Sequence, residues 1–178
     1  MRRMLVMTLI GEDRPGLVES VAGIIAERGG NWLESRMSRL GGQFAGILRV
    51  EVSAEAERPL IDSLKQLEAR GLQFLVHPDS SPPANSTARL ATLEIVGQDR
   101  PGIVQQISRA LATHGVNVEE LQSECSSAAM SGETLFKARA RLSLPQSCDV
   151  SGLRNQLEQM ASDLIVDIVL VELPVETI

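Results

Sequence analysis

The chain has 178 residues, an apolar content of 43% and a formal net charge of −6 at neutral pH. This length allows either one large domain or two small ones. The acidic balance disfavours nonspecific adhesion to DNA or to an anionic membrane, so we expect neither as a direct partner. Aromatic residues are scarce, with three Phe, one Trp and no Tyr. The scarcity predicts an aliphatic core and argues against stacking platforms for single-stranded nucleic acid.

No targeting or membrane-spanning segment is predicted. The apolar run at residues 4–10 is shorter than the core of a signal peptide and has no cleavage site after it. No stretch approaches the roughly 18 apolar residues that a membrane helix needs. Cys125 and Cys148 form neither a CxxC pair nor a metal-ligand spacing. We therefore expect reduced thiols in a cytoplasmic protein.

The first half of the chain predicts the order strand, helix, strand, strand, helix, strand. Its opening apolar run is typical of a central strand buried on both faces or nearly so. Pro15 is predicted as the first residue of the first helix, whose apolar stripe includes Val18. Gly41 and Gly42 predict a tight hairpin turn. The predicted strands are residues 4–10, 31–40, 43–53 and 72–77, and the helices are residues 15–28 and 57–70.

The second half repeats this order after a segment of linker composition. Residues 78–88 are rich in Pro and Ser and lack apolar periodicity. The chain is thus divided into a unit over residues 1–77, a linker, and a unit over residues 89–178. Each unit is predicted to be an α+β, ferredoxin-like βαββαβ domain, with an antiparallel sheet and helices on one face. The strands of the second unit are predicted at residues 89–96, 116–124, 133–144 and 164–173, and its helices at residues 101–114 and 149–162.

One eight-residue sequence occurs twice. It reads GEDRPGLV at residues 11–18 and GQDRPGIV at residues 97–104, an offset of 86 residues. Each copy follows a predicted strand and opens a predicted helix. An asparagine follows each copy at the same spacing, at Asn31 and Asn117. A repeat of this length predicts two copies of one small domain.

The repeated turn has two interpretations. A loop before a helix N-terminus offers unpaired N–H groups that suit a carboxylate, and its Asp can bind an ammonium group. The Gly admits a ligand to the backbone, and the Asn amide can donate and accept, so the set suits an α-amino acid. Alternatively, the Asp caps the helix and Pro-Gly only forms a turn. The candidate ligand-binding residues are Asp13, Arg14, Gly16, Leu17, Asn31, Asp99, Arg100, Gly102, Ile103 and Asn117.

Other polar residues carry weaker signals. His77 and His114 have no metal-ligand pattern, and no P-loop, GxSxG or HExxH sequence is present, so we expect no metal, no cofactor and no enzyme. Lys137, Arg139 and Arg141 line one face of a predicted strand. Such a row is usually a solvated face, and a surface for a protein partner is the alternative.

The repeated residues resemble the ACT domain, a small amino-acid-sensing regulatory module. The resemblance rests on DRPG followed by Leu-Val or Ile-Val, and on the later Gly-x-Asn, within a βαββαβ order. Two such domains with a Pro-rich linker and no catalytic or DNA-binding domain resemble the glycine cleavage system transcriptional repressor family. Residues 11–16 and 31–36 match the first-domain pattern of that family.

The resemblance implies a non-enzymatic regulator that binds a small amino acid such as glycine or serine. It would control glycine cleavage and one-carbon metabolism through a protein partner, a transcription activator of the LysR type, without binding DNA. ACT domains pair side by side, which would place each loop near the asparagine of the other unit. Gly11 and Gly97 stand where some members carry a His, so the ligand side chain stays open. Also open are a regulatory subunit of a metabolic enzyme, a ligand-free scaffold, and a homodimer.

Overall fold

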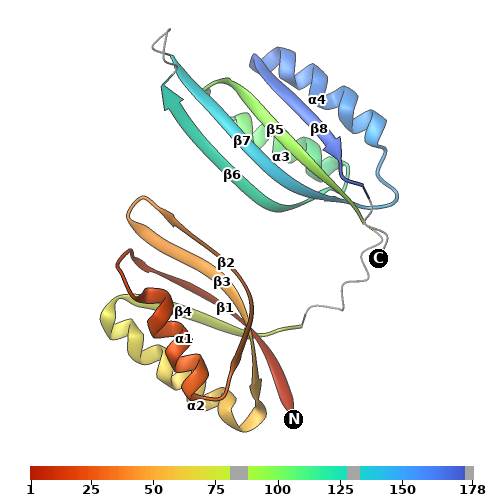
Figure 1. Ribbon diagram of the computed structural model, residues 1–178. Helices are drawn as coiled ribbons and strands as arrows, with labels where there is room; N and C mark the ends of the chain where they lie inside the picture. The colour runs from red at the N-terminus through yellow and green to blue at the C-terminus, as the bar shows by residue number, and fades with distance from the viewer. Residues whose placement is uncertain (81–87, 128–132, 175–178) are drawn as a thin grey trace. The chain divides into compact units, whose positions relative to one another are not determined.

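The computed structural model describes residues 1–80, 88–127 and 133–174. The chain divides into two compact units, Met1–Pro83 and Ala84–Ile178. Each has a four-stranded antiparallel sheet with its helices on one face (Figure 1). The predicted α+β class with two ferredoxin-like units is confirmed. Most of the predicted linker lies outside the described residues, and the predicted boundaries at residues 77 and 89 stay a prediction.

The first unit contains β1 (Arg2–Glu12), α1 (Leu17–Glu27), β2 (Asn31–Leu40), β3 (Gln43–Ser53), α2 (Ala54–Lys65), a 3-10 helix η1 (Gln66–Arg70) and β4 (Leu72–Pro78). Its sheet has the order β2-β3-β1-β4, so β2 and β4 are the edge strands. Both residues of the predicted hairpin turn, Gly41 and Gly42, have a positive φ. This conformation matches the twist of the two strands that they join.

The second unit contains β5 (Arg89–Gln98), α3 (Ile103–Thr113), β6 (Asn117–Ser127), β7 (Thr134–Leu144), α4 (Val150–Leu164) and β8 (Val166–Glu172). Its sheet has the order β6-β7-β5-β8, which repeats the order of the first unit. Helix α4 begins after Asp149, whose side chain accepts a hydrogen bond from the Gly152 N–H at 3.0 Å. An N-cap of this kind stabilises a helix by about 1 kcal/mol.

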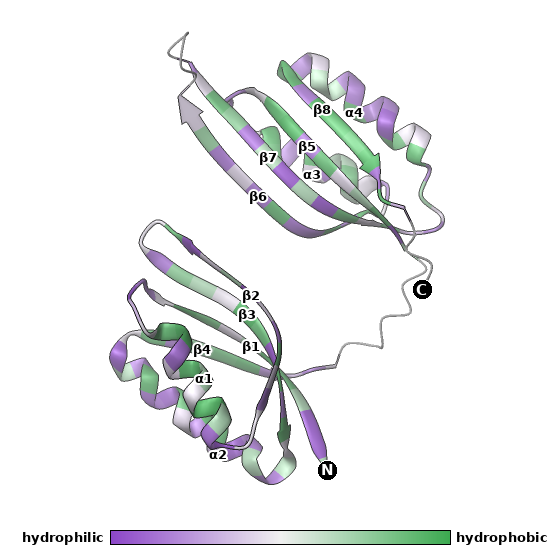
Figure 2. Cartoon of the chain, in the orientation of Figure 1, coloured by the Kyte–Doolittle hydropathy of each residue, from purple (hydrophilic) through white to green (hydrophobic). Residues whose placement is uncertain are grey.

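Aliphatic side chains form a separate core between the sheet and the helices of each unit. In the first unit, alternate residues of β1 from Leu5 to Leu9 are buried together with Val21 and Ile25 of α1. The second core is built in the same way around β5 and β7. Hydrophobic and hydrophilic residues alternate along β7 (Figure 2). This alternation is what a sheet covered on one face requires.

The prediction that residues 4–10 are buried on both faces is wrong for the outer face. Met7 is fully buried, whereas Ile10 keeps 44% of its surface exposed. Both helices of the unit cover the same face of the sheet, and the other face has no helical layer (Figure 1). An apolar residue on that outer face is shielded only by side chains of the neighbouring strands.

Three helix starts, those of α1, α2 and α3, also differ from the prediction by two or three residues. The sequence predicts Pro15 as the first helical residue, but α1 begins at Leu17. Gly16 has φ 87° and ψ 2°, the values of the third residue of a type II turn that has Pro at its second position. A residue with this φ cannot continue an α-helix, so the turn delays the helix. Helix α2 begins earlier than predicted because the Ser53 side chain accepts a hydrogen bond from the Ala56 N–H.

Among the described residues, Ile165 is the one non-glycine residue with a positive φ, at 56°. It ends α4 where, in the first unit, Gly71 ends η1 with φ 81°. The left-handed region costs a residue with a Cβ roughly 1–2 kcal/mol, and it is least suited to β-branched side chains. The Ile165 side chain is 59% exposed, so its loss removes little apolar burial.

We expect Ile165→Gly to raise the free energy of unfolding of the second unit by about 1 kcal/mol, because glycine adopts this conformation without a Cβ clash. Urea denaturation followed by circular dichroism measures the change, while the fluorescence of Trp32 follows the first unit separately. Gly71→Ala is the matched control and should destabilise the first unit. A lower stability for Ile165→Gly would show that packing of the isoleucine outweighs the strain.

Candidate functional site

The repeated sequence forms the loop between the central strand and the first helix of each unit. We call residues 13–16 the first loop and residues 99–102 the second loop. The Asp13 N–H donates to the Gly42 carbonyl at 2.9 Å, and the Asp99 N–H donates to the Thr134 carbonyl at the same distance. These bonds fix each loop to the strand pair beside it. The two loops therefore share one backbone conformation.

Neither loop caps its helix with a side chain. The N-cap residues of α1 and α3 are Gly16 and Gly102, which have φ 87° and 96° and make no side-chain cap. The interpretation of Asp13 and Asp99 as helix caps is therefore wrong for the described structure. The first-turn N–H groups of both helices lack a capping side chain and carry partial positive charge. Each loop thus presents a helix end that favours an anion.

The Asp13 carboxylate instead forms an ion pair with Arg39, whose Nε lies 2.6 Å from Asp13 Oδ2. The strand register brings this arginine to the loop, since Arg39 pairs with Phe44 and Phe44 pairs with Gly11. Sequence reasoning missed Arg39 because it lies in a different strand from the repeated residues. The hairpin register could have identified Arg39 from the sequence, because the predicted turn at Gly41 and Gly42 places residue 39 opposite residue 44.

The first loop borders a pocket of about 480 Å³. Val18 is 46% exposed there, although the sequence places it in the buried stripe of α1. Helix α3 of the second unit shows the same exception at Val104, which is 41% exposed. The three candidate residues of the first loop, Asp13, Arg14 and Gly16, line the pocket together with the candidate Leu17 of α1, and the other lining residues are Val18, Glu19, Ala22 and Phe44.

The arginines of the two loops have different partners. Arg14 donates through Nη2 to the Arg70 carbonyl at 2.9 Å, at the end of η1. Arg100 donates through Nη2 to Gln98 Oε1 at 3.2 Å. Both guanidinium groups are thus engaged with their own unit. Arg39 is the cation that contacts the carboxylate of the first loop.

The structure places the predicted asparagines far from the loop of their own unit. Asn31 pairs with Glu51 at the start of β2, whereas the first loop follows the end of β1, opposite Gln43. The strand positions between Gln43 and Glu51 span roughly 26 Å at about 3.3 Å per residue. Asn117 has the same place in the second unit, opposite Ser143. The expectation that each loop meets the asparagine of the other unit stays a prediction.

A cysteine occupies the place of Arg39 in the second unit. Cys125 pairs with Phe136, which pairs with Gly97 beside the second loop. Partial desolvation raises the pKa of the Cys125 thiol, and the charge and hydrogen bond of the Asp99 carboxylate raise it further. Among the described residues, no ion pair of Asp99 was found. The loops therefore share a backbone but differ in charge, with an ion pair in the first and a carboxylate beside a thiol in the second.

Close packing accounts for the glycine that opens each repeat. A Cβ on Gly11 would lie 2.7 Å from the Gly71 carbonyl oxygen. A Cβ on Gly97 would lie 2.7 Å from the Ile165 carbonyl oxygen and 2.6 Å from Val166. Because real Cβ contacts are longer than this, a histidine at either position would require the neighbouring backbone to shift.

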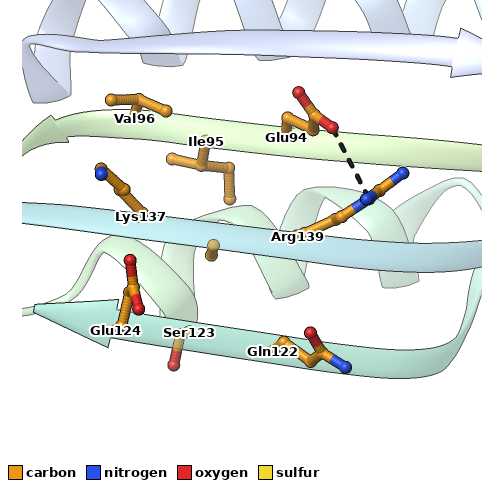
Figure 3. Close-up of a pocket in the computed structure, with 9 residues that line it drawn as sticks. Glu94, Ile95, Val96, Gln122, Ser123, Glu124, Lys137 and Arg139 are labelled. Carbon is orange, nitrogen blue, oxygen red and sulfur yellow. Dashed lines mark ion pairs between the residues drawn. The ribbon is translucent and has the colours of Figure 1, made fainter.

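The predicted basic row on β7 lies on the helix-free face of the second sheet and is matched by acidic residues. Arg139 Nε lies 3.5 Å from Glu94 Oε1 of β5 (Figure 3). Lys137 lies opposite Glu124 of β6 beside a pocket of about 400 Å³. Arg141 also has an acidic partner on β6. A face of mixed sign lacks the single-sign field that attracts nucleic acid.

Within residues 1–80, 88–127 and 133–174, no group of three His, Cys, Asp or Glu side chains could hold a metal ion. Nor is any helix in these ranges long and apolar enough to cross a membrane. His114 forms a hydrogen-bonded pair with Gln156, with 3.0 Å between Nε2 and Oε1. This contact gives the histidine a structural role at the end of α3.

Comparison with protein families identifies both units. A family model described as ACT domain matches residues 3–77, and a second model with the same description matches residues 91–136. Together the two matches span more than half of the chain. The chain belongs to the ACT-domain family. Both loops lie within the matched ranges, and so do Arg39 and Cys125, so all of these belong to the ACT fold itself.

Relatives cover nearly the whole chain. The glycine cleavage system transcriptional repressor of Escherichia coli (strain K12) is 24% identical over 162 residues, which cover 90% of this chain and 85% of that protein. The protein of the same name from Shigella flexneri matches equally. The crystal structure of an unknown protein from Galdieria sulphuraria is 29% identical, with a TM-score of 0.88, and the match covers 98% of this chain and 100% of that one. This chain therefore resembles the glycine cleavage repressors over both ACT domains.

We expect iodoacetamide to alkylate Cys125 more slowly at pH 8 than it alkylates an ordinary exposed thiol. The raised pKa reduces the thiolate fraction, and the thiolate is the nucleophile. Asp99→Asn removes the neighbouring charge, lowers the pKa of the thiol and should accelerate alkylation severalfold. Mass spectrometry separates Cys125 from the buried Cys148. An unchanged rate in Asp99→Asn would contradict the contact, and Glu94→Gln on the opposite face is the control.

Proposed function

We propose that this ACT protein is a non-enzymatic regulator that binds a small α-amino acid at an ACT loop. The observation that carries the proposal is the first loop, where the Asp13 carboxylate, the uncapped α1 N-terminus and a pocket of about 480 Å³ lie together. An α-amino acid carries opposite charges on one carbon atom, and this loop offers a group for each. Glycine and serine are the candidates that the sequence suggests.

The relatives support a role in transcription. The Escherichia coli protein that shares 24% identity over 162 residues is a glycine cleavage system transcriptional repressor. We therefore propose a co-regulator of glycine cleavage and one-carbon metabolism that acts in the cytoplasm on a protein partner, a LysR-type transcription activator. The net charge of −6 supports action through a protein rather than direct contact with DNA.

Pairing between edge strands could place each asparagine beside a loop. β2 and β6 are sheet edges, and an edge strand presents unpaired backbone groups to a further strand. In an antiparallel pair of such edges, the start of one strand lies beside the end of the other. An asparagine at the start of one strand would then reach the loop beside the end of the other. We propose Asn31 and Asn117 as ligand contacts of this kind, supplied within one chain or by a homodimer.

Isothermal titration calorimetry with the common amino acids should give a saturable signal for the wild-type chain. Asn31→Ala or Asn117→Ala, whichever asparagine reaches the occupied loop, should weaken binding by at least about tenfold, because a hydrogen bond to a charged group contributes about 1.5–3 kcal/mol. Their Tm values should stay unchanged, as should the affinity of the control Asn155→Ala on α4. No binding by any amino acid would favour a ligand-free scaffold. A large fall in Tm for both variants would show that the asparagines are structural.

The transcriptional role predicts that the chain affects promoter DNA only through the activator. The purified chain alone should not shift a glycine cleavage promoter fragment at physiological salt, because its charge repels DNA. Added to the LysR-type activator bound to that fragment, it should alter the mobility of the complex, and the effector amino acid should change this effect. An electrophoretic mobility assay measures both. Association with a biosynthetic enzyme and none with the activator would instead support a regulatory subunit.

A further inference from the structure

We propose that the first loop alone is the amino-acid site, that Arg39 binds the α-carboxylate of the ligand, and that the ligand has an aliphatic side chain. This inference rests on the proposed amino-acid binding, and it replaces glycine and serine, the candidates suggested by the sequence, with an aliphatic amino acid selected by the pocket and by Arg39. Three features carry it, namely the Arg39–Asp13 pair, the apolar lining of the pocket, and the cysteine in the second unit.

Arg39 and Asp13 form a charge pair that complements a zwitterion. The contact between them uses Nε of Arg39, and a guanidinium has five N–H donors in a planar fork. Arg39 is therefore able to bind a ligand carboxylate while it stays beside Asp13, and its side chain is 68% exposed. Asp13, with 32% of its side chain exposed, can accept from the ligand ammonium group. The two charges of an α-amino acid are adjacent, as are the two side chains.

The other cation of the first loop is directed elsewhere. Arg14 donates to the Arg70 carbonyl at 2.9 Å and so holds the end of η1. The remaining positive potential comes from the N-terminus of α1, where Gly16 provides no side-chain cap. Arg39 pairs with Asp13 beside this helix end, whose first turn also carries Glu19, and we assign the ligand carboxylate to Arg39. A bidentate guanidinium contact would add geometric selection for a carboxylate.

The pocket beyond these charges is mainly apolar. Leu17, Val18, Ala22 and Phe44 line it together with Gly16, and its charged lining residues are Asp13, Arg14 and Glu19. Val18 is 46% exposed, and a ligand side chain placed against it would remove apolar surface from water. Each buried methylene adds about fourfold in affinity. Glycine, which has no side chain, would leave this surface exposed.

At the second loop, no cation among the described residues pairs with the aspartate as Arg39 does in the first. Cys125 holds the register position of Arg39, and its neutral thiol lies beside Asp99. Arg100 is engaged by Gln98 within the same unit. An α-carboxylate at this loop would meet a helix end and an uncompensated aspartate. We therefore expect one ligand per chain although the backbone turn occurs twice.

The test is calorimetric titration of the full chain with glycine, alanine, valine and leucine. We expect one site per chain and an affinity for valine at least tenfold above that for glycine. Arg39→Cys copies the second loop and should weaken binding by about 10- to 100-fold. The matched control is Arg36→Cys, which alters an arginine of the same strand that is 60% exposed and pairs with Ile47 on the opposite face. Its affinity should equal that of the wild type.

The outcomes separate the two proposals. Absence of binding by every amino acid overturns the proposed function itself. Equal affinities for glycine and valine, two ligands per chain, or full affinity in Arg39→Cys overturn the present inference and leave the proposed function standing. Thermal melting of each variant by circular dichroism establishes that it is folded. Arg39→Gln, which keeps a polar side chain of similar length, is the second variant and should lose affinity in the same way.

Discussion

The positive φ of one glycine in each unit is the constraint on which the candidate site depends. Gly16 and Gly102 close a Pro-Gly type II turn directly before a helix. Because a glycine in this position has no side chain, nothing in the turn caps the helix, and its first N–H groups keep their partial charge. The hydrogen bond from the Asp13 N–H to the Gly42 carbonyl holds the preceding aspartate past the end of the central strand, next to the edge strand. Backbone geometry thus gives both units the same framework, and side chains decide what each framework can bind.

The two units show how far side chains can differ on the same backbone framework. Strand order and loop anchoring are the same in both, because these depend on backbone hydrogen bonds and on alternating burial. Side chains that face solvent follow no such constraint. The position next to the loop carries Arg39 in one unit and Cys125 in the other, and the outer-face position of Ile47 corresponds in register to Arg139. A duplicated fold therefore does not imply duplicated chemistry, and each loop has to be judged by its own charges.

The sequence predicts the fold well because local signals and packing agree. Alternating burial, paired glycines and a repeat of 86 residues give the element order without any long-range information. Predictions fail where a local signal has two meanings. Pro15 suits both the first position of a helix and the second position of a turn, and the φ of the next glycine decides between them. The site is harder to predict from the sequence than the fold. Arg39 reaches Asp13 only through the register of two strands, and the same register places Asn31 far from the loop.

An effector can regulate only through a difference in its affinity for two states of the protein. The proposed pocket is well placed for this, because Arg39 belongs to β2, the edge strand of the first sheet. An exposed ion pair such as Arg39–Asp13 contributes at most about 1 kcal/mol, so a ligand can rearrange it at little cost. Binding would then act directly on the strand whose backbone is open to a partner. A coupling of about 1–3 kcal/mol is typical of allosteric proteins and lies within what one charged contact at a strand edge can supply. Ligand recognition and partner recognition would in this way share a single structural element.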